Sequence, residues 1–118
     1  MMTAAVSRRA QELAAQGTAF VTATVVRAQR PTSAEAGNVA LVLGDGTIEG
    51  FVGGECAQQS VRVYALQALA TGDAILLRIV PDGPPVAPDD PGREIENDEG
   101  AVTVQNPCLS GGAIEVFL

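Results

Sequence analysis

This chain contains no histidine, no lysine and no tryptophan, and it has only two cysteines. Without histidine it cannot build by itself a Ser-His-Asp triad, a Cys-His dyad or a histidine-bound zinc site. Two thiols are too few for a four-cysteine zinc site or a disulfide framework, and a reducing compartment keeps them as thiols. Self-contained hydrolytic catalysis is therefore not expected, and a role other than that of an enzyme is favoured.

The charge balance argues against two classes of partner. The chain carries 7 basic and 14 acidic side chains, which gives a net charge of −7 and a pI near 4.3. Nucleic-acid binding depends on neutralising phosphates with cations, so DNA and RNA are not expected partners. The apolar runs are too short to cross a membrane and the N-terminus shows no secretory signal, so we expect a cytoplasmic protein without a membrane partner.

Length and composition are those of one globular domain spanning residues 1–118. A chain of 118 residues can bury one hydrophobic core but not two. Hydrophobic residues make up 47% of the chain, yet aromatic residues make up only 3%. The core must therefore be built from Ala, Val, Leu and Ile.

Periodicity and turn residues divide the chain into helices and strands. Apolar residues recur at helical spacing over residues 3–16 and 55–71, and each stretch is followed by a glycine, Gly17 or Gly72. Apolar and β-branched runs predict strands at residues 20–28, 39–43, 47–52, 74–80, 101–105 and 113–118, the second and third forming a hairpin. This order predicts an α/β (α+β) fold, a single domain in which two main helices pack against a mixed β-sheet.

Residues 81–100 differ in composition from the rest of the chain. Five of the seven prolines fall between Pro81 and Pro91, and half of the acidic side chains lie between Asp82 and Glu99. Such a composition is typical of a surface loop or a disordered excursion. We therefore expect no regular structure there.

Both cysteines stand beside the only two Gly-Gly pairs in the chain. Gly53 and Gly54 precede Cys56 at the start of the second predicted helix, and Cys108 precedes Gly111 and Gly112. Paired glycines let backbone N–H groups approach a ligand, and a helix N-terminus attracts anions and favours a thiolate. The pattern indicates a ligand site; the structural alternatives are buried cysteines and plain turns.

Several segments in a fixed order carry a family resemblance, at residues 26–33, Gly37, 45–56, 68–72, 108–112 and 114–118. Together they resemble the N-terminal domain of the XdhC/CoxI family, the maturation factors of molybdenum hydroxylases such as xanthine dehydrogenase and carbon monoxide dehydrogenase. The chain departs from the family at Glu55, where members often carry a glycine, and an added carboxylate there disfavours a phosphate. Longer members continue into a Rossmann-type domain, but this chain has no GxGxxG motif, so the resemblance implies no nucleotide binding here.

The resemblance implies a chaperone that binds the molybdenum cofactor (molybdopterin) transiently, protects it during sulfuration and passes it to an apo molybdenum hydroxylase. It also favours a homodimer, with a cysteine desulfurase as a further candidate partner. The implied metal ligand is Cys56, through the cofactor's molybdenum. The expected cofactor-binding residues are Gly53, Gly54, Cys56, Cys108, Ser110, Gly111, Gly112, Arg27 and Arg30.

Two other functions stay open at this point. The chain is alternatively a thiol redox or sulfur-relay protein, in which Cys56 and Cys108 form a disulfide or carry a persulfide. The other possibility is a purely structural interaction domain that lost its ligand when Glu55 arose. The distance between the cysteines distinguishes them, because Cα atoms more than about 7 Å apart cannot be bridged without backbone movement.

Overall fold

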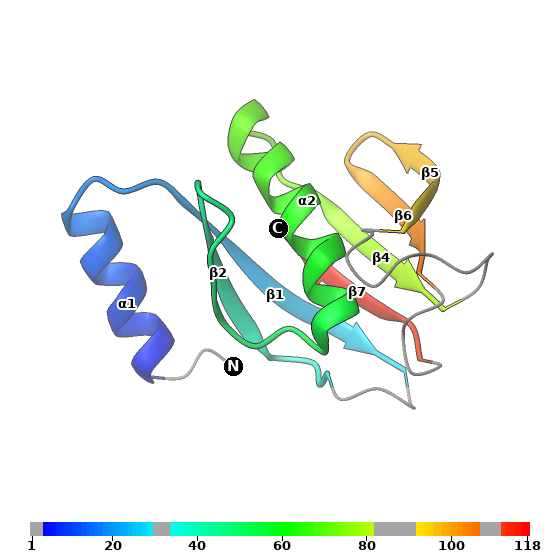
Figure 1. Ribbon diagram of the computed structural model, residues 1–118, viewed down its shortest axis with the longest axis horizontal. Coiled ribbons are helices and arrows are strands. Elements are labelled where there is room, and N and C mark those ends of the chain that lie inside the picture. The colour runs from blue at the N-terminus through cyan, green and yellow to red at the C-terminus, as the bar shows by residue number, and fades with distance from the viewer. Residues whose placement is uncertain (1–3, 30–33, 82–91, 107–111) are drawn as a thin grey trace.

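The computed structural model describes residues 4–29, 34–81, 92–106 and 112–118, and for Glu55 and Cys56 it describes the backbone only. In chain order the elements are α1 (Ala4–Ala15), β1 (Phe20–Ala28), β2 (Val39–Leu43), β3 (Ile48–Gly50), α2 (Glu55–Thr71), β4 (Leu76–Val80), β5 (Arg93–Asp98), β6 (Ala101–Gln105) and β7 (Ile114–Phe117). Figure 1 shows these elements along the chain. None of the described helices is both long enough and apolar enough to traverse a membrane.

The seven strands form one mixed sheet in the order β3-β2-β1-β7-β4-β6-β5. Strands β4 and β6 run parallel, and every other neighbouring pair is antiparallel. The last strand, β7, lies between β1 and β4 and joins the two halves of the sheet (Figure 1). The expected fold class, a mixed sheet with two helices in one α+β domain, is confirmed.

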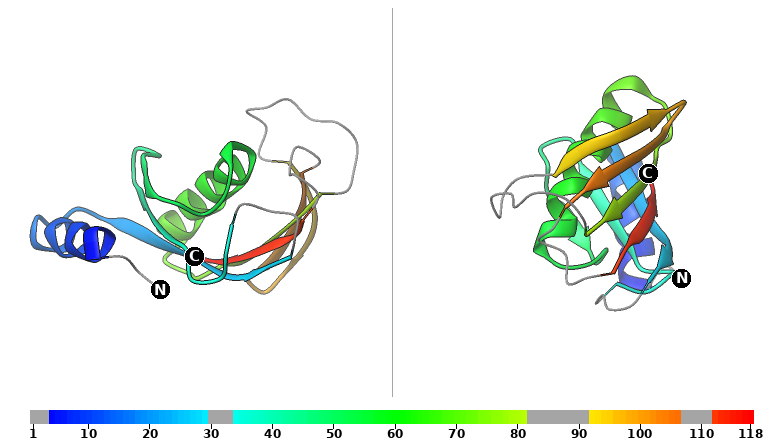
Figure 2. Two further views of the ribbon diagram at one scale, coloured as in Figure 1. Left: turned by 90° about the horizontal axis from the view of Figure 1, so that it is seen from below. Right: turned by 90° about the vertical axis from the view of Figure 1, so that its right-hand side faces the viewer.

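Helix α2 covers one face of the sheet and forms the main core with it (Figure 2). Alternate strand residues point toward α2 and are almost completely buried, among them Val25, Leu77, Val102 and Val116. The helix ends where Gly72 adopts a left-handed conformation (φ 78°) and its N–H donates to the carbonyl oxygen of Ala68 at 2.8 Å. The core is aliphatic, as the shortage of aromatic residues requires.

Helix α1 packs against the other face of the sheet, at β2 and β3. Leu13 of α1 and Leu41 of β2 are buried outside the main core. Glu49 of β3 is the register partner of Leu41, and it accepts a hydrogen bond from Nε of Arg9 at 3.0 Å. Strand β2 is consequently covered from both sides, whereas α1 leaves the remainder of this face uncovered.

Most of the predicted elements have the expected bounds, but the expectation for residues 81–100 is wrong over its second half. Residues Arg93–Asp98 form strand β5, which pairs antiparallel with β6 through a turn at Glu99 and Gly100. All of β5 is exposed, so it shows no apolar alternation that the sequence would reveal. Charged side chains are what an edge strand uses to avoid pairing with other chains. Residues 82–91 lie outside the described residues.

Candidate functional site

Four connections meet at one end of the sheet, which we call the loop end. The connections β1–β2, β3–α2, β4–β5 and β6–β7 all begin or end there, because Ala28, Ile79 and Ile114 are register neighbours at the same edge. Loops held by a rigid sheet are where binding residues concentrate. The loop end contains described residues from both glycine-cysteine segments.

Gly53 is required by packing. Its φ of +125° lies in the region that favours glycine, and a Cβ built there would lie 3.2 Å from the Cβ of Ala57 and 3.6 Å from the Cβ of Ala34. The same position is 3.8 Å from Cδ1 of Ile114. The backbone therefore turns into α2 in a conformation that strains any L side chain, and a Cβ there would crowd Ala57.

Gly54 differs from Gly53 both in its backbone angles and in the space around it. Its φ of −69° and ψ of 179° suit any residue, it is exposed, and a Cβ there would meet no atom within 4 Å. It is the N-cap of α2, yet it supplies no side-chain hydrogen bond to the first turn. Since first-turn N–H groups lack partners within the helix, this exposed end is suited to an anion.

A buried polar pair connects α2 with the second segment. Asn106 and Ser60 are both completely buried, and Nδ2 of Asn106 donates to Oγ of Ser60 at 3.3 Å. The backbone N–H of Asn106 donates to the carbonyl oxygen of Val80 at 2.7 Å. Asn106 directly precedes residues 107–111, so the chain enters the second glycine-cysteine segment beside the early turns of α2.

Beyond residues 107–111 the chain returns to the loop end at Gly112, which is buried. Ile114, two residues later, is the residue that packs near Gly53. The structure therefore places Gly53, Gly54 and Gly112 at the same end of the sheet. Their role in binding remains a prediction. Five of the expected site residues lie wholly or in their side chain outside the described residues: Arg30, Cys108, Ser110, Gly111 and the side chain of Cys56.

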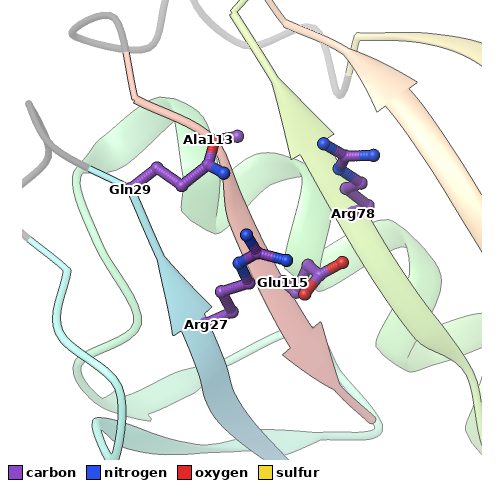
Figure 3. A pocket seen from close by; sticks show the side chains of 5 residues that line it. All are labelled: Arg27, Gln29, Arg78, Ala113 and Glu115. Atoms are coloured by element: carbon purple, nitrogen blue, oxygen red, sulfur yellow. The ribbon is translucent and has the colours of Figure 1, made fainter.

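Arg27 lies away from the α2 N-terminus. Its register partner is Glu115, and both side chains project from the face of the sheet that is turned away from α2 (Figure 3). Arg27 is exposed there and lines a small pocket with Gln29, Arg78, Ala113 and Glu115. The structure therefore does not bring Arg27 together with the glycines of the candidate site.

Tyr64 holds the β5–β6 hairpin against α2. Its hydroxyl donates to Oε1 of Glu94 at 2.8 Å. Burial is the larger cause and this hydrogen bond the smaller one, and together they raise the pKa of Tyr64 above its ordinary value of 10. The phenol is therefore neutral at physiological pH and acts as a structural donor.

The described part of the loop end offers backbone N–H groups and a helix N-terminus without a side-chain cap, rather than a reactive centre. Within residues 4–29, 34–81, 92–106 and 112–118, no three Cys, Asp or Glu side chains gather closely enough to hold a metal ion.

Two groups of residues were missed at the sequence level. Ser60 and Asn106 show no pattern of their own in the sequence. Arg78 and Glu115 are polar residues in otherwise alternating apolar strands. A charged residue between two buried apolar residues of a strand indicates that one face of the sheet is exposed to solvent.

Comparison with known proteins identifies one family. The sequence model described as the XdhC and CoxI family matches residues 13–80, from the end of α1 to the end of β4. The match contains the Gly53-Gly54 turn and the whole of α2. No curated protein matched the chain with significance.

Proposed function

Because the chain belongs to the XdhC and CoxI family, whose members are maturation factors of molybdenum hydroxylases, we propose that it is a molybdenum-cofactor chaperone. In this role it binds the cofactor transiently and delivers it to an apo hydroxylase of the xanthine dehydrogenase or carbon monoxide dehydrogenase type. A cysteine desulfurase that sulfurates the cofactor is the second proposed partner. Such a carrier needs no histidine, triad or general base.

The exposed N-terminus of α2 is the observation that supports this proposal best. The cofactor carries a phosphate, and a phosphate suits a helix N-terminus where no side chain caps the first turn. Gly54 leaves that position open, since a Cβ there would meet nothing within 4 Å. Gly53 fixes the approach of the backbone through its φ of +125°.

The thiols supply the second half of the proposal. Cys56 belongs to the first turn of α2, where the helix dipole favours a thiolate, and a thiolate is a ligand suited to a soft metal centre. Cys108 follows Pro107 and has no comparable helix N-terminus before it in the sequence. We therefore assign the larger contribution to Cys56.

The test measures molybdenum retention. The purified chain is incubated with cofactor released from a denatured molybdenum enzyme, separated by gel filtration, and analysed for metal. Cys56→Ser is expected to lose most of the bound molybdenum, and Cys108→Ser is expected to lose less. Both variants should keep the wild-type circular dichroism spectrum, because serine is nearly isosteric with cysteine.

Equal retention by wild type and Cys56→Ser contradicts the metal-ligand assignment. No retention by the wild-type chain contradicts the chaperone function itself. In that case mass spectrometry after incubation with a cysteine desulfurase tests the sulfur-relay alternative, which requires a persulfide on Cys56 or Cys108.

A further inference from the structure

The face of the sheet that α1 leaves uncovered carries exposed apolar side chains. We call the part of this face formed by β1, β7, β4, β6 and β5 the open face. Phe117 of β7 is 49% exposed and its register partner Leu76 of β4 is 39% exposed, although both strands lie inside the sheet. Large apolar side chains that lie together on a surface mark an interaction site more often than scattered ones do.

A hollow with a volume of about 220 Å³ lies beside Leu76, over β4 and β6. Six residues of the open face line it in two neighbouring rows: Leu76 and Ala101, then Glu115, Arg78, Thr103 and Glu96. Pockets that hold small molecules usually measure about 300–1,000 Å³. The hollow is therefore better suited to a single side chain of a partner protein than to a free small molecule.

The charge that lines the hollow is negative overall, because the lining contains two carboxylates and one guanidinium. Glu115 lies between Arg27 and Arg78 of the neighbouring strands, which balance its charge (Figure 3). Glu96 has no such neighbour, since its register partner Thr103 separates it from Arg78 and β5 is the edge strand. In the described part of the chain, the side chain of Glu96 forms no hydrogen bond and no ion pair within 4 Å. Glu96 therefore carries the unbalanced charge of the hollow.

Asp98 adds a second acidic group to the same edge of the open face. Its register partner is Ala101, and both residues face away from α2 because the next residue of β6, Val102, is buried in the core. The whole chain carries a net charge of −7, which attracts cationic groups over a longer range. A basic side chain is therefore the group that this part of the open face fits.

Helix α1 shows how this side of the sheet receives a helix. Leu13 of α1 and Leu41 of β2 are both buried, and Nε of Arg9 donates to Oε1 of Glu49 at 3.0 Å. The contact thus combines an apolar side chain with an arginine that bonds a strand glutamate. The open face offers the same two features farther along the sheet, an exposed apolar pair and an unpaired glutamate.

We propose that the open face docks a helix of another protein that presents apolar side chains beside an arginine or lysine. The apolar side chains of this helix pack on Phe117 and Leu76. The stem of its basic side chain lies along Leu76 and Ala101, and the cationic head reaches Glu96. Long basic side chains commonly bury their stems on apolar surface in this way while the charged head stays in a polar environment.

The open face has room for this helix beside α1. Helix α1 packs at β2 and β3, whereas the proposed helix lies over β4. Strands β2 and β4 are three strand spacings apart, about 14 Å, because β1 and β7 lie between them. Packed helices need only about 8–10 Å between their axes.

Binding of a designed peptide tests the proposal. The probe is a fluorescent helical peptide of about 20 residues with leucine on one stripe and arginine on the adjacent stripe, and a second peptide carries glutamate in place of arginine. Fluorescence anisotropy measures the Kd, and NMR of isotope-labelled protein locates the contact. The arginine peptide is expected to bind and to shift the amide signals of β4, β6 and β5. The glutamate peptide is expected not to bind.

Substitutions on the open face separate the charge from the apolar contact. Glu96→Gln combined with Asp98→Asn should raise the Kd about tenfold, since each exposed ion pair contributes up to about fivefold. Leu76→Ala should raise it about fivefold or more, as for a residue near the centre of an interface. The matched control is Glu35→Gln combined with Asp73→Asn, which changes the net charge equally at two exposed sites outside the open face. It should keep the Kd within about twofold of wild type.

Each of four results overturns the proposal. The first two are no binding of the arginine peptide up to about 1 mM and equal binding of the glutamate peptide. The others are equal Kd values for the Glu96 and Asp98 double variant and its control, and amide shifts confined to the loop end. A wild-type-like NMR spectrum of each unbound variant shows that it folds. No cofactor is present in these measurements, so their outcome does not bear on the proposed chaperone function.

Discussion

Replacing Gly54 with serine should stabilise the protein while weakening the proposed site. The φ of −69° and ψ of 179° at this N-cap are compatible with serine, and a Cβ there would meet no atom within 4 Å. Serine in place of glycine at an N-cap contributes a few tenths of a kcal/mol through the bond to the first turn. Reduced freedom of the unfolded chain adds about 0.4–1 kcal/mol.

The sum, about 1 kcal/mol, corresponds to a rise in Tm of about 4 °C for a domain of this size. Urea unfolding should show a midpoint higher by about 0.5 M with an unchanged slope, for a slope of about 2 kcal/mol/M. Gly53→Ser is the matched control. Its φ of +125° and the 3.2 Å approach to Ala57 predict a loss of stability larger than the gain at Gly54.

The expected effect of Gly54→Ser on molybdenum retention is opposite to its effect on stability. A serine hydroxyl at Gly54 accepts the first-turn N–H that an anionic ligand would otherwise bind, so Gly54→Ser should retain less molybdenum than wild type despite its higher Tm. A lower Tm for Gly54→Ser would refute the reading of this N-cap as unstrained and open. Full retention of molybdenum by a stabilised Gly54→Ser would show that the N-terminus of α2 does not hold the phosphate.

Two further predictions concern the stability of the fold. Asn106→Ala removes the bond to buried Ser60, so urea unfolding should show a loss of about 1–3 kcal/mol. A loss below about 0.5 kcal/mol would contradict a structural role for the pair. The backbone N–H of Thr47 bonds Asp45 at 2.9 Å and lowers the pKa of Asp45 below its ordinary value of 3.8. The resulting stability is present above that pH and is lost as the pH falls through the lower folded pKa. Asp45→Ala should therefore be less stable than wild type at neutral pH, and the difference should disappear in acid below that folded pKa. Urea titrations at both pH values check this, and a difference that persists in acid would contradict it.

Local features of the sequence determined the helices and most of the strands. Helix α2 runs from Glu55 to Thr71 as predicted, because Gly54 and Gly72 bound an apolar pattern of helical period. The aliphatic composition determined the kind of core, and the missing histidines determined which chemistries the chain cannot perform. Strand β5 escaped prediction because an exposed edge strand has one neighbour and no buried face, so no apolar alternation is needed.

The arrangement of the candidate site was decided by the tertiary structure. The sequence marked Gly53 and Gly54 as equivalent, but their backbone angles and neighbours assign one to packing and leave the other open. The sequence also grouped Arg27 with the glycines, whereas strand pairing places it on the opposite face, beside Glu115. Which strands become neighbours depends on contacts between residues far apart in the chain. The central place of β7, and with it the position of Arg27 beside Glu115, is therefore fixed only when the sheet assembles over α2.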